Sequence, residues 1–173
     1  MRFIIIYLIL FSSYPVFSQT PLNYLGTLVL NNKTAISFKL VLTEEKGIVN
    51  GFSITNIGTK DETKSEIKGL YFKSDRSFQL KEMQILSTNS DAPRNTFCYI
   101  NMQLSFRGKL SKKHLEGDFI GNFLDGSECA SGKIIMIEED RINKKIQKIK
   151  QKIEKKYYKN DTNLIQQTKI LKD

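Results

Sequence analysis

The residues of this chain that could carry out chemistry gather in one short stretch, "HLEGDFIGNFLDGSEC", residues 114–129. It contains the single histidine of the chain, His114, together with a cysteine and four carboxylates. The carboxylates are Glu116, Asp118, Asp125 and Glu128. Paired carboxylates hydrolyse glycosides when they face each other across a cleft, and clustered acids also occur in calcium loops. The stretch is therefore an acidic active site, a metal loop or a tight β-hairpin.

The spacing within this stretch favours the hairpin. Apolar and small residues alternate with polar ones, as in a half-buried strand. One face carries Leu115, Gly117, Phe119, Gly121 and Phe123, and the other carries Glu116, Asp118 and Asn122. Asp125-Gly126 is a residue pair that two-residue hairpin turns favour. A calcium loop needs further oxygen ligands before the glycine and a Glu near its end. We therefore predict solvent-facing acids, with no metal site and no cofactor.

The remaining catalytic arrangements are poorly supported by the sequence. One histidine excludes a zinc site built on several imidazoles. A Ser-His-Asp arrangement would need His114, and the chain has no G-x-S-x-G motif. Glu66 and Glu82 lie on other predicted strands and are interpreted as solvated strand-face residues. We predict that no residue is catalytic and that the protein is not an enzyme; a small secreted hydrolase using strand-face carboxylates is the alternative.

The N-terminal segment, "MRFIIIYLILFSSYPVFSQT", has the order of a secretory signal peptide. Arg2 precedes an apolar run, and Pro15 and the small residue Ser18 follow it. The run is too short for a permanent transmembrane anchor. We therefore predict a signal peptide over residues 1–18, cleaved near Ser18, and a secreted or periplasmic protein.

Two cysteines, Cys98 and Cys129, are the only ones in the chain. An even number in an exported chain favours a disulfide bond. The predicted strands place both at one end of the sheet with another strand between them. With a strand between them, the two cysteines would lie too far apart, because a disulfide bond needs their Cα atoms within roughly 7 Å. Cys129 follows the "DGSE" turn, which can fold over the rim, so we predict the bond; two reduced thiols are the alternative.

Between residues 22 and 137 the apolar residues recur at every second position. In "AISFKLVL", for example, Ile36, Phe38, Leu40 and Leu42 share one face, which is the pattern of a half-buried strand. Eight such runs are separated mostly by short turn signals. They cover about 22–31, 34–43, 47–55, 64–73, 76–88, 95–107, 114–124 and 129–138. We predict an all-β fold, an eight-stranded antiparallel up-and-down meander over residues 19–137. A closed barrel, which leaves no exposed edge, is preferred over a two-sheet sandwich.

The C-terminal segment differs in composition from the rest of the chain. Residues 138–173 contain neither Gly nor Pro and carry 11 Lys and Arg against 6 Asp and Glu. A stripe of isoleucines at helical spacing predicts a basic amphipathic helix over 138–159, followed by a disordered tail over 160–173. The stripe consists of Ile142, Ile146, Ile149 and Ile153. It has three interpretations: packing on the barrel or solvent exposure, oligomerisation through a short coiled coil, or weak contact with an anionic surface. Lysines for that last contact are Lys144, Lys145, Lys148 and Lys152.

The net charge of +9 suggests nucleic acid as a possible class of partner. Much of that charge lies in the lysine-rich helix of a chain predicted to be exported, so we exclude nucleic acid.

The run "GIVNGFSIT…SEIKGLYF…FCYINMQLSF…LEGDFIGNF…CASGKIIM" resembles small secreted β-rich proteins and modules of Bacteroidetes-type bacteria, which are mostly uncharacterised. The likeness covers about residues 25–137 and implies an exported β-rich fold. The overall plan also looks like the avidin and lipocalin barrels, without their signature motifs. We therefore expect an exported, non-catalytic binding or interaction module for a small ligand or a protein or cell-surface partner. An eight-stranded outer-membrane barrel is a third possibility.

Overall fold

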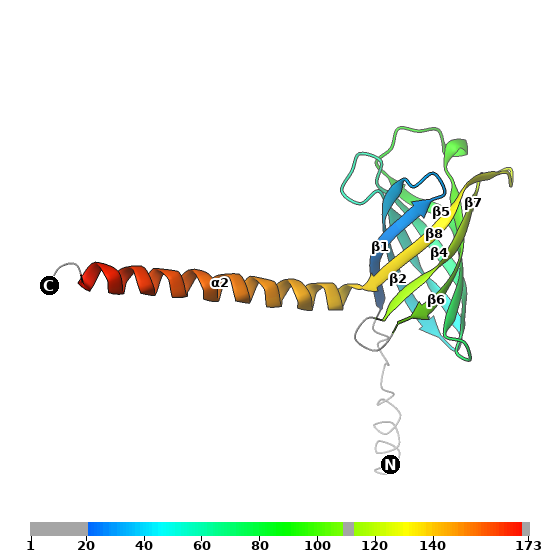
Figure 1. Ribbon diagram of the computed structural model, residues 1–173. Helices are drawn as coiled ribbons and strands as arrows, with labels where there is room; N and C mark the ends of the chain where they lie inside the picture. Colours follow the sequence, from blue (N-terminus) through cyan, green and yellow to red (C-terminus); the bar gives the residue numbers. More distant parts are fainter. Residues whose placement is uncertain (1–20, 109–112, 171–173) are drawn as a thin grey trace, which may run out of the picture.

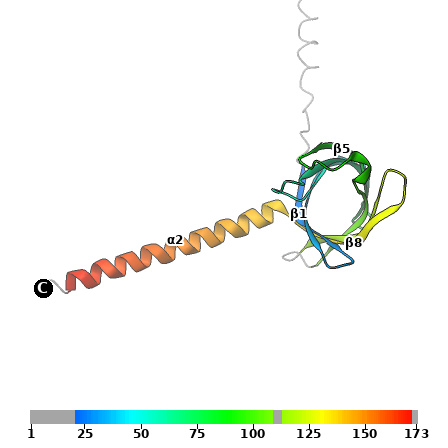
Figure 2. The same ribbon diagram turned by 90° about the horizontal axis from the view of Figure 1, so that it is seen from above.

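The computed structural model describes residues 21–108 and 113–170, with the backbone alone for 157–170. Eight antiparallel strands follow each other in chain order and close into a barrel, and one helix leaves it (Figures 1 and 2). The strands are β1 (Leu22–Leu30), β2 (Ala35–Glu45), β3 (Ile48–Thr55), β4 (Thr63–Phe72), β5 (Ser77–Thr88), β6 (Tyr99–Arg107), β7 (His114–Asn122) and β8 (Glu128–Glu138). The predicted closed up-and-down barrel is confirmed. The predicted signal peptide, residues 1–18, lies outside the described residues.

The inward-facing residues of every strand form one apolar core. On β2 the inner face is the predicted one, with Phe38, Leu40 and Leu42 fully buried. Leu80, Leu104 and Ile134 contribute from β5, β6 and β8. Burying a large apolar side chain contributes about 1.5 to 3 kcal/mol, so this core drives closure. Because its side chains fill the middle of the barrel, open space is confined to the two ends.

Several inward-facing glycines allow the strands to approach closely. A Cβ atom added at Gly117 would overlap the backbone carbonyl of Gln103 on the neighbouring strand β6. The same overlap with a neighbouring backbone would occur at Gly26, Gly51, Gly69 and Gly132. Glycines inside strands are typical of close approach between backbones and of strong curvature. The repeated glycines thus shape a barrel with a narrow, filled interior.

The predicted disulfide bond between Cys98 and Cys129 is present, with the two Cα atoms 6.0 Å apart. Strand β7 does lie between the two cysteines, but the residue at the crossing point is Gly121. A Cβ atom there would overlap Cys98 Sγ and lie 3.1 Å from Cys129 Sγ. A register shift next to Gly121 in the β7–β8 pair also displaces the start of β8. The bond therefore passes over the bare backbone of β7 on the inner side of the barrel.

Helix α2 (Glu139–Ile170) continues β8 without a linker and projects away from the barrel (Figures 1 and 2). Glu139 forms an ion pair of 2.8 Å with Lys39 on β2, and the Arg141 guanidinium donates to the Lys113 carbonyl. Ile146, Ile149 and Ile153 are exposed, so this part of the stripe does not pack on the barrel. Self-association through the stripe and contact with an anionic surface remain predictions.

Helix α2 extends further toward the C-terminus than predicted. The backbone of residues 160–170 is helical, where the sequence predicts a helix ending at 159 and a disordered tail. The segment "NDTNLIQQTKI" contains no glycine or proline, so nothing in it stops a helix once the preceding turns have formed.

We expect a chain truncated after Glu138 to keep a cooperative unfolding transition and its β-sheet circular dichroism. Removing α2 deletes the partly exposed Lys39–Glu139 pair and few other barrel contacts, so the free energy of unfolding should fall by about 1 kcal/mol. Urea titration of both chains measures this loss. Glu139→Gln in the full chain shows how much of the loss comes from the Lys39–Glu139 ion pair. Loss of cooperativity in the truncated chain would place the helix in the core.

Candidate functional site

A pocket of about 290 Å³ opens at the end of the barrel that carries the disulfide bond. It lies among the ends of the strands, with η1 (Arg94–Thr96) and the segment before β4 at its rim. Its apolar lining consists of Leu28, Leu30, Ile36, Ile85, Phe97, Ile100, Phe119, Ala130 and the disulfide at Cys98. Its polar lining residues include Asn56, Asp61, Ser90 and Thr96, and deeper in the barrel Thr63, Ser65 and Glu82. Mostly apolar walls with a few convergent polar groups are typical of small-molecule sites.

Glu82 is the buried carboxyl of this pocket, with only 3% of its surface exposed. The Ser53 hydroxyl on β3 donates to its Oε1 atom. The backbone N–H of Ile100 on β6 donates to its Oε2 atom over 2.9 Å. Three strands, β3, β5 and β6, thus hold one carboxyl group across the interior of the barrel.

Burial raises the pKa of Glu82 to about 7, against the opposing effect of its hydrogen bonds from Ser53 and Ile100. Both the neutral and the ionised carboxyl are therefore populated near neutral pH. A carboxylate has about four lone-pair sites, and the two hydrogen bonds occupy two of them. The group keeps capacity for a further donor in the pocket.

The interpretation of Glu82 as a solvated strand-face residue is wrong. A signal was available, since Phe78, Leu80 and Glu82 recur at period two and the first two are buried. The pairing of β4 with β5 is irregular, because Ser65 pairs with Ile85 whereas Ile67 pairs with Glu82. This bulge changes the phase of β5, so the alternation after Glu82 does not show which face is inside.

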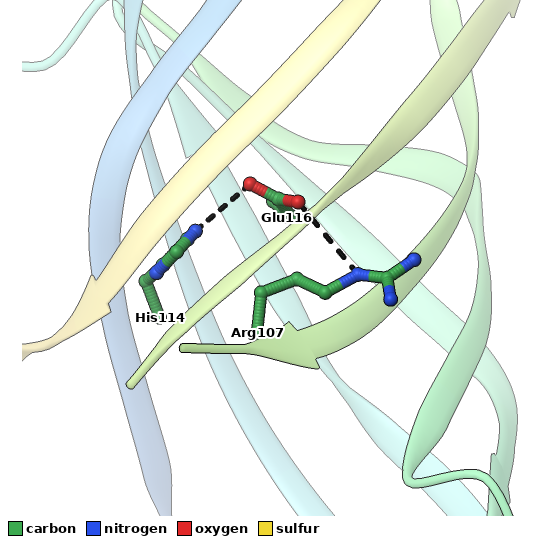
Figure 3. A network of polar contacts seen from close by, with 3 residues as sticks. All are labelled: Arg107, His114 and Glu116. Carbon is green, nitrogen blue, oxygen red and sulfur yellow. Dashed lines mark hydrogen bonds and ion pairs between the residues drawn. The ribbon is translucent and has the colours of Figure 1, made fainter. Parts of the chain in front are cut away.

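Glu116 and Asp118, the two acids of this stretch on β7, lie on the outer surface of the barrel, as predicted. There, Glu116 forms an ion pair with Arg107 and a hydrogen bond with His114, with Arg107 Nε 3.7 Å from Oε1 and His114 Nε2 2.8 Å from Oε2 (Figure 3). Asp118 is exposed and lies opposite Gln103 and Lys133 in the sheet register. These side chains are on the opposite face of the barrel wall from the pocket.

In the described register of β6 and β7, no hydroxyl lies directly opposite His114. The register places Ser105 opposite Glu116, whereas His114 lies opposite Arg107. A nucleophile activated by a histidine needs its hydroxyl within hydrogen-bonding reach of the imidazole. Among the described residues, no group of three or more His, Cys, Asp and Glu side chains is arranged to hold a metal ion. The cluster therefore fits a polar network that stabilises neighbouring strands.

The turn between β7 and β8 differs in length from the predicted two-residue turn. Its loop spans residues 123–127, and Gly126 adopts a φ of 87° within it. The Asp125 carboxylate accepts from the Ser127 N–H over 2.9 Å and from the Ser127 hydroxyl over 2.6 Å. These bonds lower the pKa of Asp125. Asp125 is thus a turn former, as predicted, in a longer hairpin loop.

A second pocket, of about 350 Å³, opens at the opposite end of the barrel. Its aromatic residues pack on one another, with ring centroids 4.7 Å apart for Tyr71 and Phe78 and 5.8 Å apart for Phe78 and Phe106. Burial, with smaller effects of Glu138 and Tyr71, raises the pKa of Tyr24 there to about 12. Both cationic and anionic side chains belong to its lining, so it is more polar than the first pocket.

Comparison with known proteins gives no relative: no family model, no curated protein and no solved structure matches this chain. Within the described part of the chain, no helix has the length and apolar content needed to cross a membrane.

Proposed function

We propose that this protein binds a small, mainly apolar molecule in the pocket at the disulfide end, without converting it chemically. The observation that carries the proposal is the apolar pocket with the buried Glu82 carboxyl in its deeper part. Apolar walls supply affinity through the area that they remove from water. A single buried polar group orients a ligand, because a mismatched partner would leave that group without its hydrogen bond.

The proposed setting is the periplasm or the exterior of the cell. The Cys98–Cys129 bond supports this setting, because disulfide bonds persist in oxidising compartments. The segment with the order of a signal peptide supports it independently.

The distribution of side chains on the barrel favours a ligand carrier over an outer-membrane barrel. The interior holds the apolar core, and charged side chains such as Lys68, Lys81 and Asp118 point outward. Outer-membrane barrels have the reverse arrangement, with an apolar outer band and a polar interior.

Fluorescence titration with N-phenyl-1-naphthylamine tests the proposed pocket. We expect saturable binding of one probe molecule per chain. Ala130→Phe places a large side chain among the residues that line the pocket and should weaken binding at least about tenfold, since it occupies the space of the probe. Lys133→Phe, on the exposed outer face of the same strand, is the matched control and should bind as the native protein does. Absence of saturable binding, or equal binding by Ala130→Phe, would refute the proposal.

Turnover of common substrates tests the enzyme alternative. Glycosides, esters, peptides and phosphoesters should give equal background rates with the native protein and with His114→Ala, Glu116→Ala and Asp118→Ala, because the strand register sets Arg107, which is not a nucleophile, opposite His114. The exposed Asp118→Ala change should alter the free energy of unfolding by about 0.5 kcal/mol or less. Reproducible turnover that one of these substitutions abolishes would establish a hydrolase.

A further inference from the structure

The charge of the pocket contrasts with the charge of the whole chain. The protein has a net charge of +9, yet Asp61 and Glu82 are the charged side chains among the described residues that line the pocket. Both are acidic, and no Lys, Arg or His belongs to this described lining. Charges of one sign in a cleft with low-dielectric walls focus the field and attract ligands of the opposite sign. The pocket is therefore an acidic opening in a basic protein.

We propose that the ligand of this pocket is an apolar amine whose ammonium group binds the Glu82 carboxylate. This inference rests on the proposed function and adds the chemical class of the ligand to it. The apolar body would lie against residues such as Phe97, Ile100 and Phe119, and Asp61 would add a negative potential along the route inward.

The hydrogen-bonding capacity of the pocket matches an ammonium group. Glu82 has acceptor sites left beyond those used by Ser53 and Ile100. Thr63 and Ser65, which also line the pocket, add hydroxyl oxygens that accept hydrogen bonds. An ammonium group has three donors and no acceptor, so this set of acceptors can satisfy it. The carboxyl is already buried in the empty protein, so the ligand does not have to desolvate it on binding.

Other classes of ligand fit less well. A ligand carboxylate would place a second negative charge beside Glu82 and Asp61, and like charges brought together out of water repel strongly. A neutral alcohol can donate one hydrogen bond to Glu82, but it lacks the charge-assisted bond, which is roughly twice as strong as a neutral one. Affinity should therefore decrease from amine to alcohol to carboxylate on the same apolar body.

The preference for the amine should depend on pH. The elements around Glu82 present Ser53 from β3, Thr63 and Ser65 from β4, and the Ile100 backbone from β6, while Asp61 is the other described carboxylate of the pocket. Ser53, Thr63, Ser65 and the Ile100 backbone do not titrate between pH 5 and pH 8. Since the pKa of Glu82 is about 7, the carboxylate that binds an ammonium group is fully present only above that pH. The amine preference should increase from pH 5 to pH 8.

Isothermal titration calorimetry with three compounds tests this inference: 2-phenylethylamine, 2-phenylethanol and 3-phenylpropanoate. At pH 8 we expect the amine to bind about tenfold more tightly than the alcohol, with the carboxylate weakest. At pH 5 the amine and the alcohol should differ by less than about threefold, since Glu82 is then neutral. Glu82→Gln should abolish the amine preference at pH 8. Glu66→Gln, on the outer face of β4, is the control and should behave as the native protein.

The outcomes separate the two proposals. Equal affinities for amine and alcohol at pH 8, or an amine preference that Glu82→Gln leaves unchanged, overturn the amine assignment while binding in the pocket stands. Failure of the native protein to bind all three compounds and N-phenyl-1-naphthylamine overturns both. If Glu82→Gln does not fold, the pH series on the native protein decides, because a preference that is the same at pH 5 and pH 8 also overturns the assignment.

Discussion

Gly121→Ala should lower the free energy of unfolding by about 5 kcal/mol in the native protein and by about 1 kcal/mol in a chain without the disulfide bond. A methyl group at position 121 would occupy the space of Cys98 Sγ and crowd Cys129 Sγ. The bond must then break, fail to form or force the strands apart. The chain-entropy model assigns about 3.7 kcal/mol to a disulfide that joins residues 31 positions apart, and overpacking adds about 1 kcal/mol.

A double-mutant cycle measures this coupling. The four proteins are the native chain, Gly121→Ala, Cys98→Ala/Cys129→Ala and the triple variant, each unfolded in urea under non-reducing conditions. Removing both sulfurs also removes the atoms nearest to the added methyl group, so the glycine should become nearly replaceable. The mass of native Gly121→Ala shows whether the bond has formed. An equal loss of stability in both backgrounds would contradict the crossing of the bond over β7.

The second large effect is a dependence of stability on pH that arises from Glu82. Burial raises its pKa from 4.5 to about 7 on folding. The folded state therefore holds more protons than the unfolded state between these two values, and stability falls as pH rises through this window. The contribution of Glu82 to the free energy of unfolding is full below pH 4.5 and decreases by about 3 kcal/mol once the pH exceeds 7.

Glu82→Gln isolates this contribution, because the amide keeps the shape of the side chain and does not titrate. Urea titrations at pH 5, 6, 7 and 8 should show the native protein losing stability relative to Glu82→Gln as pH increases. Taking the difference cancels the titration of the remaining carboxylates. Glu66→Gln serves as the control, because hydrogen bonds from Lys68 and Gln84 lower the pKa of Glu66. A constant difference between the native protein and Glu82→Gln at all four pH values would show that the carboxyl is not buried.

The amino-acid sequence by itself determined the strands, their facing over most of the barrel and the helix that follows. These features depend on residues close together in the chain. Alternation at period two places Phe38, Leu40 and Leu42 inside and Glu116 and Asp118 outside, because successive side chains of a strand point to opposite faces. The helical spacing of the isoleucines works in the same way for α2.

Only the tertiary structure decided the features that join distant strands. The sequence predicted the disulfide bond but gave no path for it, since the path depends on the β7–β8 register and on Gly121 at the crossing point. The burial of Glu82 was also missed from the sequence, because the bulge between β4 and β5 interrupts the alternation after that residue. The depth at which the apolar core stops and the pocket begins follows from strand tilt and register, which are set only when β1 pairs with β8 and the barrel closes.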